Sequence, residues 1–191
     1  MPNLGHRLGG IGPGSGNTIK SLQATVGKVS DPRFLYWEFD VHESEDGILF
    51  VYHDDDIEID GEMVLVKNVE MQRLKNAGEQ LGFKIPTFSE VISELSSRNE
   101  KTMIEIKHLH SDEARREIIA AMEGRANWML MATPIRFLQS FPSNSREFWH
   151  HEILKAGTKL VRVRRHRVDL FAASRTRIGW LFAIPKWLFG I

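Results

Sequence analysis

Charged and imidazole side chains stand at the ends of four short apolar stretches of this sequence. In chain order, these side chains are His6 and Arg7, Glu38 and Asp40, His53 and Asp54, and Glu105 and Lys107. Side chains two residues apart on a strand point to the same face of a sheet. If the stretches are neighbouring parallel strands, we expect Glu38, Asp40 and Glu105 to converge on one point.

Three carboxylates that converge in a partly desolvated pocket repel one another strongly. A hard divalent cation, Mg²⁺ or Ca²⁺, would neutralise them, because both ions prefer oxygen ligands. We therefore predict one divalent cation held by Glu38, Asp40 and Glu105. Arg7 and Lys107 would add hydrogen-bond donors for an anion such as phosphate.

His6 and His53 are suited to proton transfer at a phosphodiester. One imidazole can remove a proton from the attacking oxygen, and the other can protonate the departing alkoxide. The cation and the basic side chains would stabilise the extra negative charge of the transition state. An isolated His-Arg pair is usually a surface feature, so this interpretation depends on the joint pattern.

The composition limits the classes of protein to which the chain can belong. Its 191 residues suit one domain, and 42% hydrophobic and 26% charged residues are typical of a globular fold. The absence of cysteine excludes disulfides, zinc–cysteine sites, iron–sulfur clusters and thiol nucleophiles. We see neither a signal peptide at the start nor an apolar run long enough to span a membrane, so we expect a cytoplasmic location.

The elements that must position these residues alternate between strands and helices. We expect strands at 34–41, 48–53, 102–106, 136–141 and 159–163. We expect helices at 19–26, 69–81, 87–95, 112–122 (with a continuation toward Met131) and 146–156. Residues 54–69 are interpreted as an acidic irregular segment with a turn at Asp60-Gly61. This alternation predicts an α/β fold with a parallel sheet, open or closed into a barrel, whose chemistry lies at the carboxyl ends of the strands.

The chain resembles the glycerophosphodiester phosphodiesterase family, whose members have a TIM-type (β/α) barrel. The matching stretches are GHR at Gly5–Arg7, NT at Asn17–Thr18, EFDV at Glu38–Val41, DGILFVYHD at Asp46–Asp54, IPTFSEV at Ile85–Val91 and IEIK at Ile104–Lys107. Each stretch alone is weak evidence. Together, in the family's order and at similar separations, they are a strong signal.

The resemblance implies a reaction, the hydrolysis of glycerophosphodiesters to an alcohol and glycerol 3-phosphate, and it implies roles for individual residues. His6 and His53 match the family's general acid/base pair. Glu38, Asp40 and Glu105 match its metal-binding carboxylates. Arg7 and Lys107 match the residues that contact the substrate phosphate. Two alternatives remain open. One is a related phospholipase-type reaction that ends at a cyclic phosphate, and the other is a non-catalytic module that binds phosphate or a membrane.

Three departures from the family pattern stand out. Leu8 replaces a glycine after the His-Arg pair, and Gly16 replaces a glutamate before Asn17. The later strands match poorly beyond a serine-phenylalanine pair at Ser140-Phe141. We therefore expect a barrel that is shortened or incomplete in its C-terminal half, or one completed by a partner such as a second copy of the chain.

The C-terminal part of the chain is basic and then aromatic. Residues 155–191 carry nine Lys and Arg against one acid, Asp169, although the whole chain has a net charge of zero. We divide the chain into a barrel domain, 1–177, and an apolar aromatic segment, 178–191. This segment either closes the barrel or lies at an anionic membrane surface. No nucleic-acid-binding module is recognisable, so no nucleic-acid partner is expected.

Other histidines have simpler interpretations. We expect His42 to point away from Glu38 and Asp40, as a residue out of phase on the same strand. His108 and His110 lie just beyond Lys107, where a position at the rim of the site is a minor alternative to a surface or core role.

Overall fold

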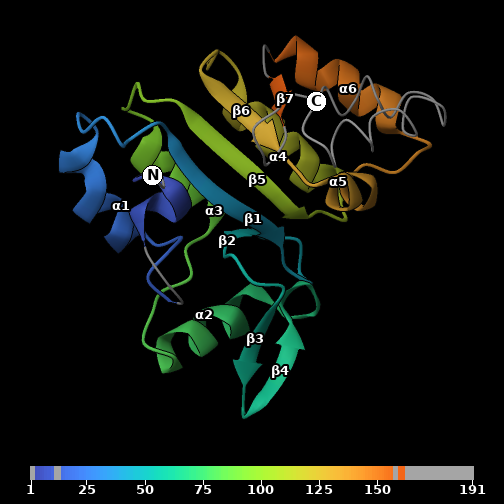
Figure 1. Ribbon diagram of the computed structural model, residues 1–191. Coiled ribbons are helices and arrows are strands. Elements are labelled where there is room, and N and C mark those ends of the chain that lie inside the picture. Colours follow the sequence, from blue (N-terminus) through green and yellow to red (C-terminus); the bar gives the residue numbers. More distant parts are fainter. Residues whose placement is uncertain (1–2, 11–13, 157–158, 162–191) are drawn as a thin grey trace.

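The computed structural model describes residues 3–10, 14–156 and 159–161 (Figure 1). The basic stretch 162–177 and the aromatic segment 178–191 lie outside these residues, and so do the interpretations placed on them. In the part of the chain that the structure describes, no helix is long and apolar enough to cross a membrane.

A five-stranded sheet forms the centre of the described fold, with the strand order β2-β1-β5-β6-β7. Its strands are β1 (Trp37–Glu43), β2 (Leu49–Val51), β5 (Thr102–His108), β6 (Trp128–Met131) and β7 (Lys159–Val161). The pairs β1–β5, β5–β6 and β6–β7 are parallel, which confirms the predicted parallel sheet. Among the described residues the sheet is open, because its edge strands β2 and β7 do not pair with each other.

The edge strand β2 differs from the expectation of parallel neighbours. It pairs antiparallel with β1, with Val41 opposite Val51. A short turn at Asp46-Gly47, where Gly47 has φ 81, joins the two strands directly. A turn this short can only form a hairpin, since a parallel pair needs a long crossover connection.

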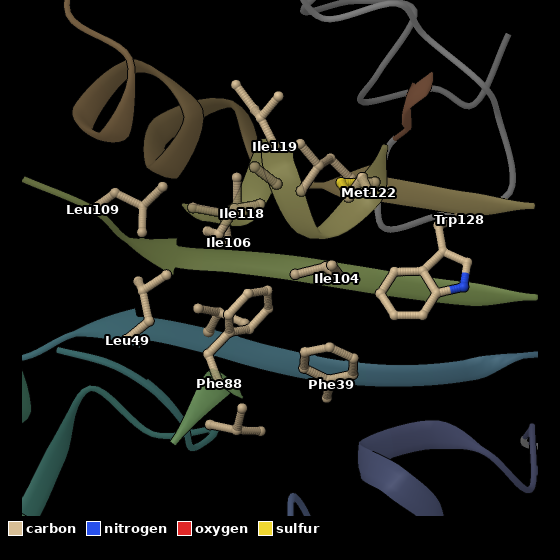
Figure 2. Packing of buried hydrophobic residues seen from close by; sticks show 14 of the residues in the cluster. Phe39, Leu49, Phe88, Ile104, Ile106, Leu109, Ile118, Ile119, Met122 and Trp128 are labelled. Carbon is tan, nitrogen blue, oxygen red and sulfur yellow. The ribbon is translucent and has the colours of Figure 1, made fainter. Parts of the chain in front are cut away.

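The core lies on the side of the sheet covered by helices. These helices are α1 (Ile19–Thr25), α3 (Phe88–Leu95), α4 (Asp112–Met122), α5 (Pro134–Ser140) and α6 (Arg146–Lys155). Figure 2 shows Phe39 and Ile104 of the central strands beside Phe88 of α3 and Ile118 of α4. All seven residues of β1 are buried.

Capping boxes begin two of these helices. Thr87 accepts a hydrogen bond from Glu90 N at 3.2 Å while the Glu90 carboxylate accepts one from Thr87 N at 2.7 Å, which is a capping box. Thr18 forms a similar box with Ser21 at the start of α1. These caps fix where α1 and α3 begin relative to the strands.

A small second unit follows β2 and projects from one end of the sheet (Figure 1). It consists of β3 (Asp56–Ile59), β4 (Glu62–Leu65) and α2 (Met71–Gln80), around its own apolar cluster. The prediction of an irregular segment at 54–69 is therefore wrong, because residues 56–65 of this segment form a hairpin. The Asp60-Gly61 turn, with φ 56 and 83, and the alternating exposure of β3 explain this outcome.

Two further predictions are wrong. Residues 136–141 belong to α5 and its end instead of a strand, and the strand β6 occupies residues that were assigned to an extension of α4. The first stretch also differs, since His6–Gly9 form a 3-10 turn, η1, and not the end of a strand. Two other 3-10 turns are η2 (Val26–Lys28) and η3 (Val66–Asn68).

Candidate active site

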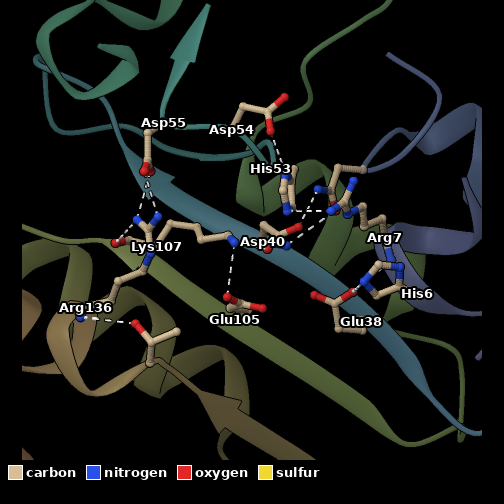
Figure 3. A network of polar contacts seen from close by, with 12 residues as sticks. His6, Arg7, Glu38, Asp40, His53, Asp54, Asp55, Glu105, Lys107 and Arg136 are labelled. Atoms are coloured by element: carbon tan, nitrogen blue, oxygen red, sulfur yellow. Dashed lines mark hydrogen bonds and ion pairs between the residues drawn. The ribbon is translucent and has the colours of Figure 1, made fainter. Parts of the chain in front are cut away.

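Three carboxylates meet where β1 and β5 lie side by side. Asp40 is the register partner of Glu105, and Glu38 lies two residues before Asp40 on the same face of β1. One oxygen from each of the three lies within 4.8 Å of the others, and all three residues are buried. Within the described ranges, no other group of three His, Cys, Asp or Glu residues meets this geometry. Figure 3 shows the arrangement.

The electrostatics of this group favour a bound cation. Burial, with the nearby Asp40 charge, raises the pKa of Glu38 to about 8. The same two causes raise the pKa of Glu105. Glu38 Oε1 is buried and has no hydrogen-bond partner. Oxygen ligands that are costly to ionise and lack a partner are suited to a hard divalent cation, so these residues fit such an ion.

Lys107 provides a positive charge at this group from within the chain. Its Nζ lies 3.0 Å from Asp40 Oδ1 and 3.1 Å from Glu105 Oε1. Burial alone would lower the pKa of Lys107, but the Asp40 and Glu105 carboxylates outweigh it and raise that pKa. Lys107 therefore stays protonated and compensates part of the negative charge.

The turn η1 brings His6 and Arg7 to Glu38. Arg7 N donates to Glu38 Oε2 at 2.9 Å, and His6 Nε2 lies 3.6 Å from the same oxygen. Glycine is required at position 5, because a Cβ there would lie 2.1 Å from Tyr36 O. This close approach lets Gly5 O accept a hydrogen bond from Glu38 N at 2.9 Å, so the turn is anchored on β1.

His53 follows β2 and faces the same group from the other side (Figure 3). The Arg7 guanidinium donates to His53 Nε2, which makes that nitrogen an acceptor. His53 Nδ1 then carries the proton and donates to Asp54 Oδ1 at 2.6 Å. The pKa of His6 is lowered by burial and by the Arg7 charge. The structure thus brings together the seven residues to which the sequence analysis assigned catalytic, metal-binding or phosphate-binding roles.

The sequence model of the glycerophosphoryl diester phosphodiesterase family matches residues 12–160. The chain belongs to this family. No curated protein matches it significantly.

Solved structures with a similar fold carry the names of glycerophosphodiester phosphodiesterases. A candidate member from Galdieria sulphuraria has a TM-score of 0.60 at 18% identity, over 85% of this chain and 64% of its own. The Thermotoga maritima protein has a TM-score of 0.53 at 20% identity, over 90% of this chain and 63% of its own. A glycerophosphoryl diester phosphodiesterase domain from Mycobacterium tuberculosis has a TM-score of 0.54 at 15% identity, over 82% and 57%. The chain spans less than two thirds of the length of each.

Two positions that depart from the family pattern lie beside Arg7. Leu8 takes a left-handed backbone with φ 56, where the family's glycine would fit without strain, and its side chain is fully buried. Gly16 packs against Arg7, and a Cβ there would lie 3.0 Å from Arg7 Cβ. A larger residue at position 16 would therefore press on the Arg7 side chain.

Asn17 is a site residue that the sequence analysis treated only as part of a family motif. Its Nδ2 donates to Asp40 Oδ2 at 2.8 Å, and its own N–H donates to Arg7 O at 2.7 Å. Thr18, and not Asn17, caps α1. The position of Asn17 beside Thr18 in the family motif was the signal that pointed to it.

The interpretation of His42 was wrong. Residues 38, 40 and 42 are in phase on a strand, and the charges that act on the His42 ring are those of Asp55, Arg136 and Lys107 at the same end of the sheet. The ring is 1% exposed and stacks on Phe50 at 5.5 Å. Burial lowers the pKa of His42 to about 3, so it stays neutral as a packing residue.

His108 and His110 lie at the end of β5. His108 is half-buried, and burial lowers its pKa. His110 Nε2 lies 3.3 Å from Glu43 Oε1, and its backbone N–H donates to Glu43 Oε2 at 2.6 Å. Glu43 therefore anchors the start of α4 and has no contact with the three carboxylates among its observed hydrogen bonds and ion pairs.

Proposed function

We propose that this chain hydrolyses glycerophosphodiesters to an alcohol and glycerol 3-phosphate. The observation that carries the proposal is the convergence of His6, Arg7 and His53 on the carboxylates of β1 and β5. Membership of the family supports the substrate class. The fold likeness supports a further proposal, that the open sheet is the first part of a (β/α) barrel with a shortened C-terminal half.

Glu38, Asp40 and Glu105 would hold the divalent cation, Mg²⁺ or Ca²⁺. Their burial, their mutual distances and the unpartnered Glu38 Oε1 support this assignment. When bound, the cation supplies positive charge that neutralises the carboxylates and polarises a phosphoryl oxygen.

Arg7 and Lys107 would bind the substrate phosphate. Both carry positive charge toward the space between His53 and the carboxylates, where Lys107 Nζ has two anionic neighbours within 3.1 Å. When a phosphate enters, the Arg7 guanidinium can donate a hydrogen bond to a phosphate oxygen in place of the one that it donates to His53 Nε2.

His53 is suited to the role of general base. With Nδ1–H held by Asp54, the Nε2 lone pair is directed into the site and becomes free once Arg7 binds the phosphate. His6 would then supply the proton to the departing alkoxide.

Turnover of glycerophosphocholine and glycerophosphoethanolamine by the purified chain tests the proposal. Released glycerol 3-phosphate is measured with Mg²⁺, with Ca²⁺ and with chelator, for the wild type, His6→Ala and His53→Ala. His151→Ala, an exposed histidine on α6, is the matched control. We expect cation-dependent turnover that falls at least about 100-fold in the two site variants and not in the control.

Two results would overturn the proposal. Absence of turnover with every diester would refute the activity, and equal turnover by wild type, His6→Ala and His53→Ala would refute the acid/base roles. Phosphorus NMR of the products identifies the alternative reaction, since a cyclic phosphate would accumulate instead of glycerol 3-phosphate.

A further inference from the structure

Arg136 on α5 forms a three-way contact beside the site. Its Nη1 donates to Asp55 Oδ1 at 2.9 Å and its Nη2 donates to Asp55 Oδ2 at 2.8 Å, a bidentate pair. The same Nη1 donates to the backbone carbonyl of Lys107 at 2.9 Å. Figure 3 shows the guanidinium between these two partners.

The two partners belong to segments that carry proposed site residues. Asp55 lies two residues after His53, in the segment that leads from β2 to β3. Lys107 is near the end of β5, whose pairing with β6 stops at Glu105 and Met131. The Lys107 carbonyl accepts a hydrogen bond from the Arg136 side chain. One guanidinium therefore joins the His53 segment to the Lys107 segment.

We propose that Arg136 is a positioning residue, which holds His53 and Lys107 at fixed positions on opposite sides of the substrate phosphate. This inference rests on the proposed function. Arg136 itself acts through Asp55 and the Lys107 backbone.

The energetics separate this role from a general contribution to stability. The Arg136 and Asp55 side chains are 23% and 53% exposed, and partly exposed ion pairs contribute at most about 1 kcal/mol to folding. A shift of about 1 Å in a reacting group, by contrast, can cost on the order of 100-fold in rate. Loss of the contact should therefore change turnover far more than stability.

A double-mutant cycle tests the proposal, with Arg136→Gln, Asp55→Asn and the double variant. We expect each single change to lower kcat at least about tenfold with KM changed less than about threefold, and the double variant to be no worse than either single one. Arg136→Lys should recover only part of kcat, because an ammonium cannot reproduce the bidentate contact. Arg73→Gln, which removes an exposed ion pair with Asp60 on the small unit, is the control.

Two measurements do not depend on turnover. Mg²⁺ affinity should change much less than kcat does, because Arg136 has no hydrogen bond to the three carboxylates and acts on them only through Lys107 and at a distance. In spectra of histidine-labelled protein, the His53 imidazole signals should shift or broaden in Arg136→Gln while those of His151 stay unchanged.

The outcomes are distinct from those of the proposed function. If the wild type turns over no diester, the proposed function is refuted. The histidine spectra alone then decide whether Arg136 positions His53. An unchanged His53 signal in Arg136→Gln would overturn the positioning role. Additive losses in the cycle, a rise in KM alone, or an equal loss of Mg²⁺ affinity would overturn it as well.

Discussion

The side-chain amide of Asn17 donates to Asp40 Oδ2 at 2.8 Å, with both residues buried, so it fixes one oxygen of a carboxylate in the site. Asn17 holds a left-handed backbone, φ 60, that asparagine and glycine adopt more readily than other residues. The helix cap beside it is provided by Thr18. Asn17 is therefore available to orient Asp40.

Asn17→Gly should lower Mg²⁺ affinity by about tenfold while leaving the fold intact. Glycine tolerates the backbone conformation, so the change removes the hydrogen bond with little strain. Loss of a residue that orients a metal ligand typically costs about 10- to 100-fold in affinity. Calorimetric titration with Mg²⁺ measures the effect, with Asn68→Gly at the end of η3 as the control. Unchanged affinity in Asn17→Gly would show that Asp40 needs no such support.

Lys107→Met should destabilise the protein in chelator by about 3 kcal/mol, because it leaves the buried Asp40 and Glu105 charges without their internal partner. Saturating Mg²⁺ should restore most of this loss. Urea unfolding with and without Mg²⁺ measures both quantities, and Lys20→Met on the exposed surface of α1 is the control. A loss of stability that Mg²⁺ does not reduce would contradict the shared role of Lys107 and the cation.

The stability of the chelated protein should fall as the pH rises from about 7 to 8. The pKa of Glu38 is raised from 4.5 to about 8, so over this interval the unfolded chain has released a proton that the folded chain still binds. The slope should approach about 1 kcal/mol per pH unit at most. The lowered pKa values of His6, His42 and His108 oppose this slope up to about one pH unit above the unfolded histidine pKa of 6.5, so the fall should be steepest near pH 8.

Urea unfolding at several pH values in this interval measures the slope. Glu38→Gln should remove it, because the variant has no titrating group at position 38. Mg²⁺ should remove it as well, since a bound cation favours the ionised carboxylate. A slope that persists in Glu38→Gln would assign the effect to another residue.

Leu8 presents two opposing effects at one position. Its left-handed backbone costs about 1 kcal/mol, which glycine would recover, but its fully buried side chain contributes about 3 kcal/mol. We expect Leu8→Gly to be destabilised by about 2 kcal/mol, because the loss of packing exceeds the relief of strain. Leu8→Ala should be worse, as it keeps the strain and loses the packing. Thermal unfolding ranks the three proteins, and a Leu8→Gly variant as stable as wild type would show that strain dominates.

The site was more predictable from the sequence than the elements around it. Glu38 and Asp40 share a face because they lie two apart on one strand, whereas Glu105 could be placed with them only by assuming that its strand is the parallel neighbour of theirs, which it is. The elements that failed are those with ambiguous periodicity. Trp128–Met131 is a four-residue apolar run directly after a helix, and such a run fits either a strand or a helix extension.

Helix α5 had a signal that was given too little weight. Thr133 before Pro134 is a typical cap and first position of a helix, and Phe137 and Phe141 have the spacing of one helical face. The role of Arg136 could not be predicted, because its contact with Asp55 depends on how α5 follows β6 and how the segment after His53 turns. Neither feature is local in the sequence.

The alignment of Asp40 with Glu105 has a consequence for the folding of the chain. A slip of one residue between the two central strands would send one of these acids to the opposite face. An ion shared by both would thus act as a cross-link that closes the long loop between the strands only when they are correctly aligned. Chelation should therefore slow the formation of the native strand pairing. The ion proposed for catalysis would then also guide the folding of the chain.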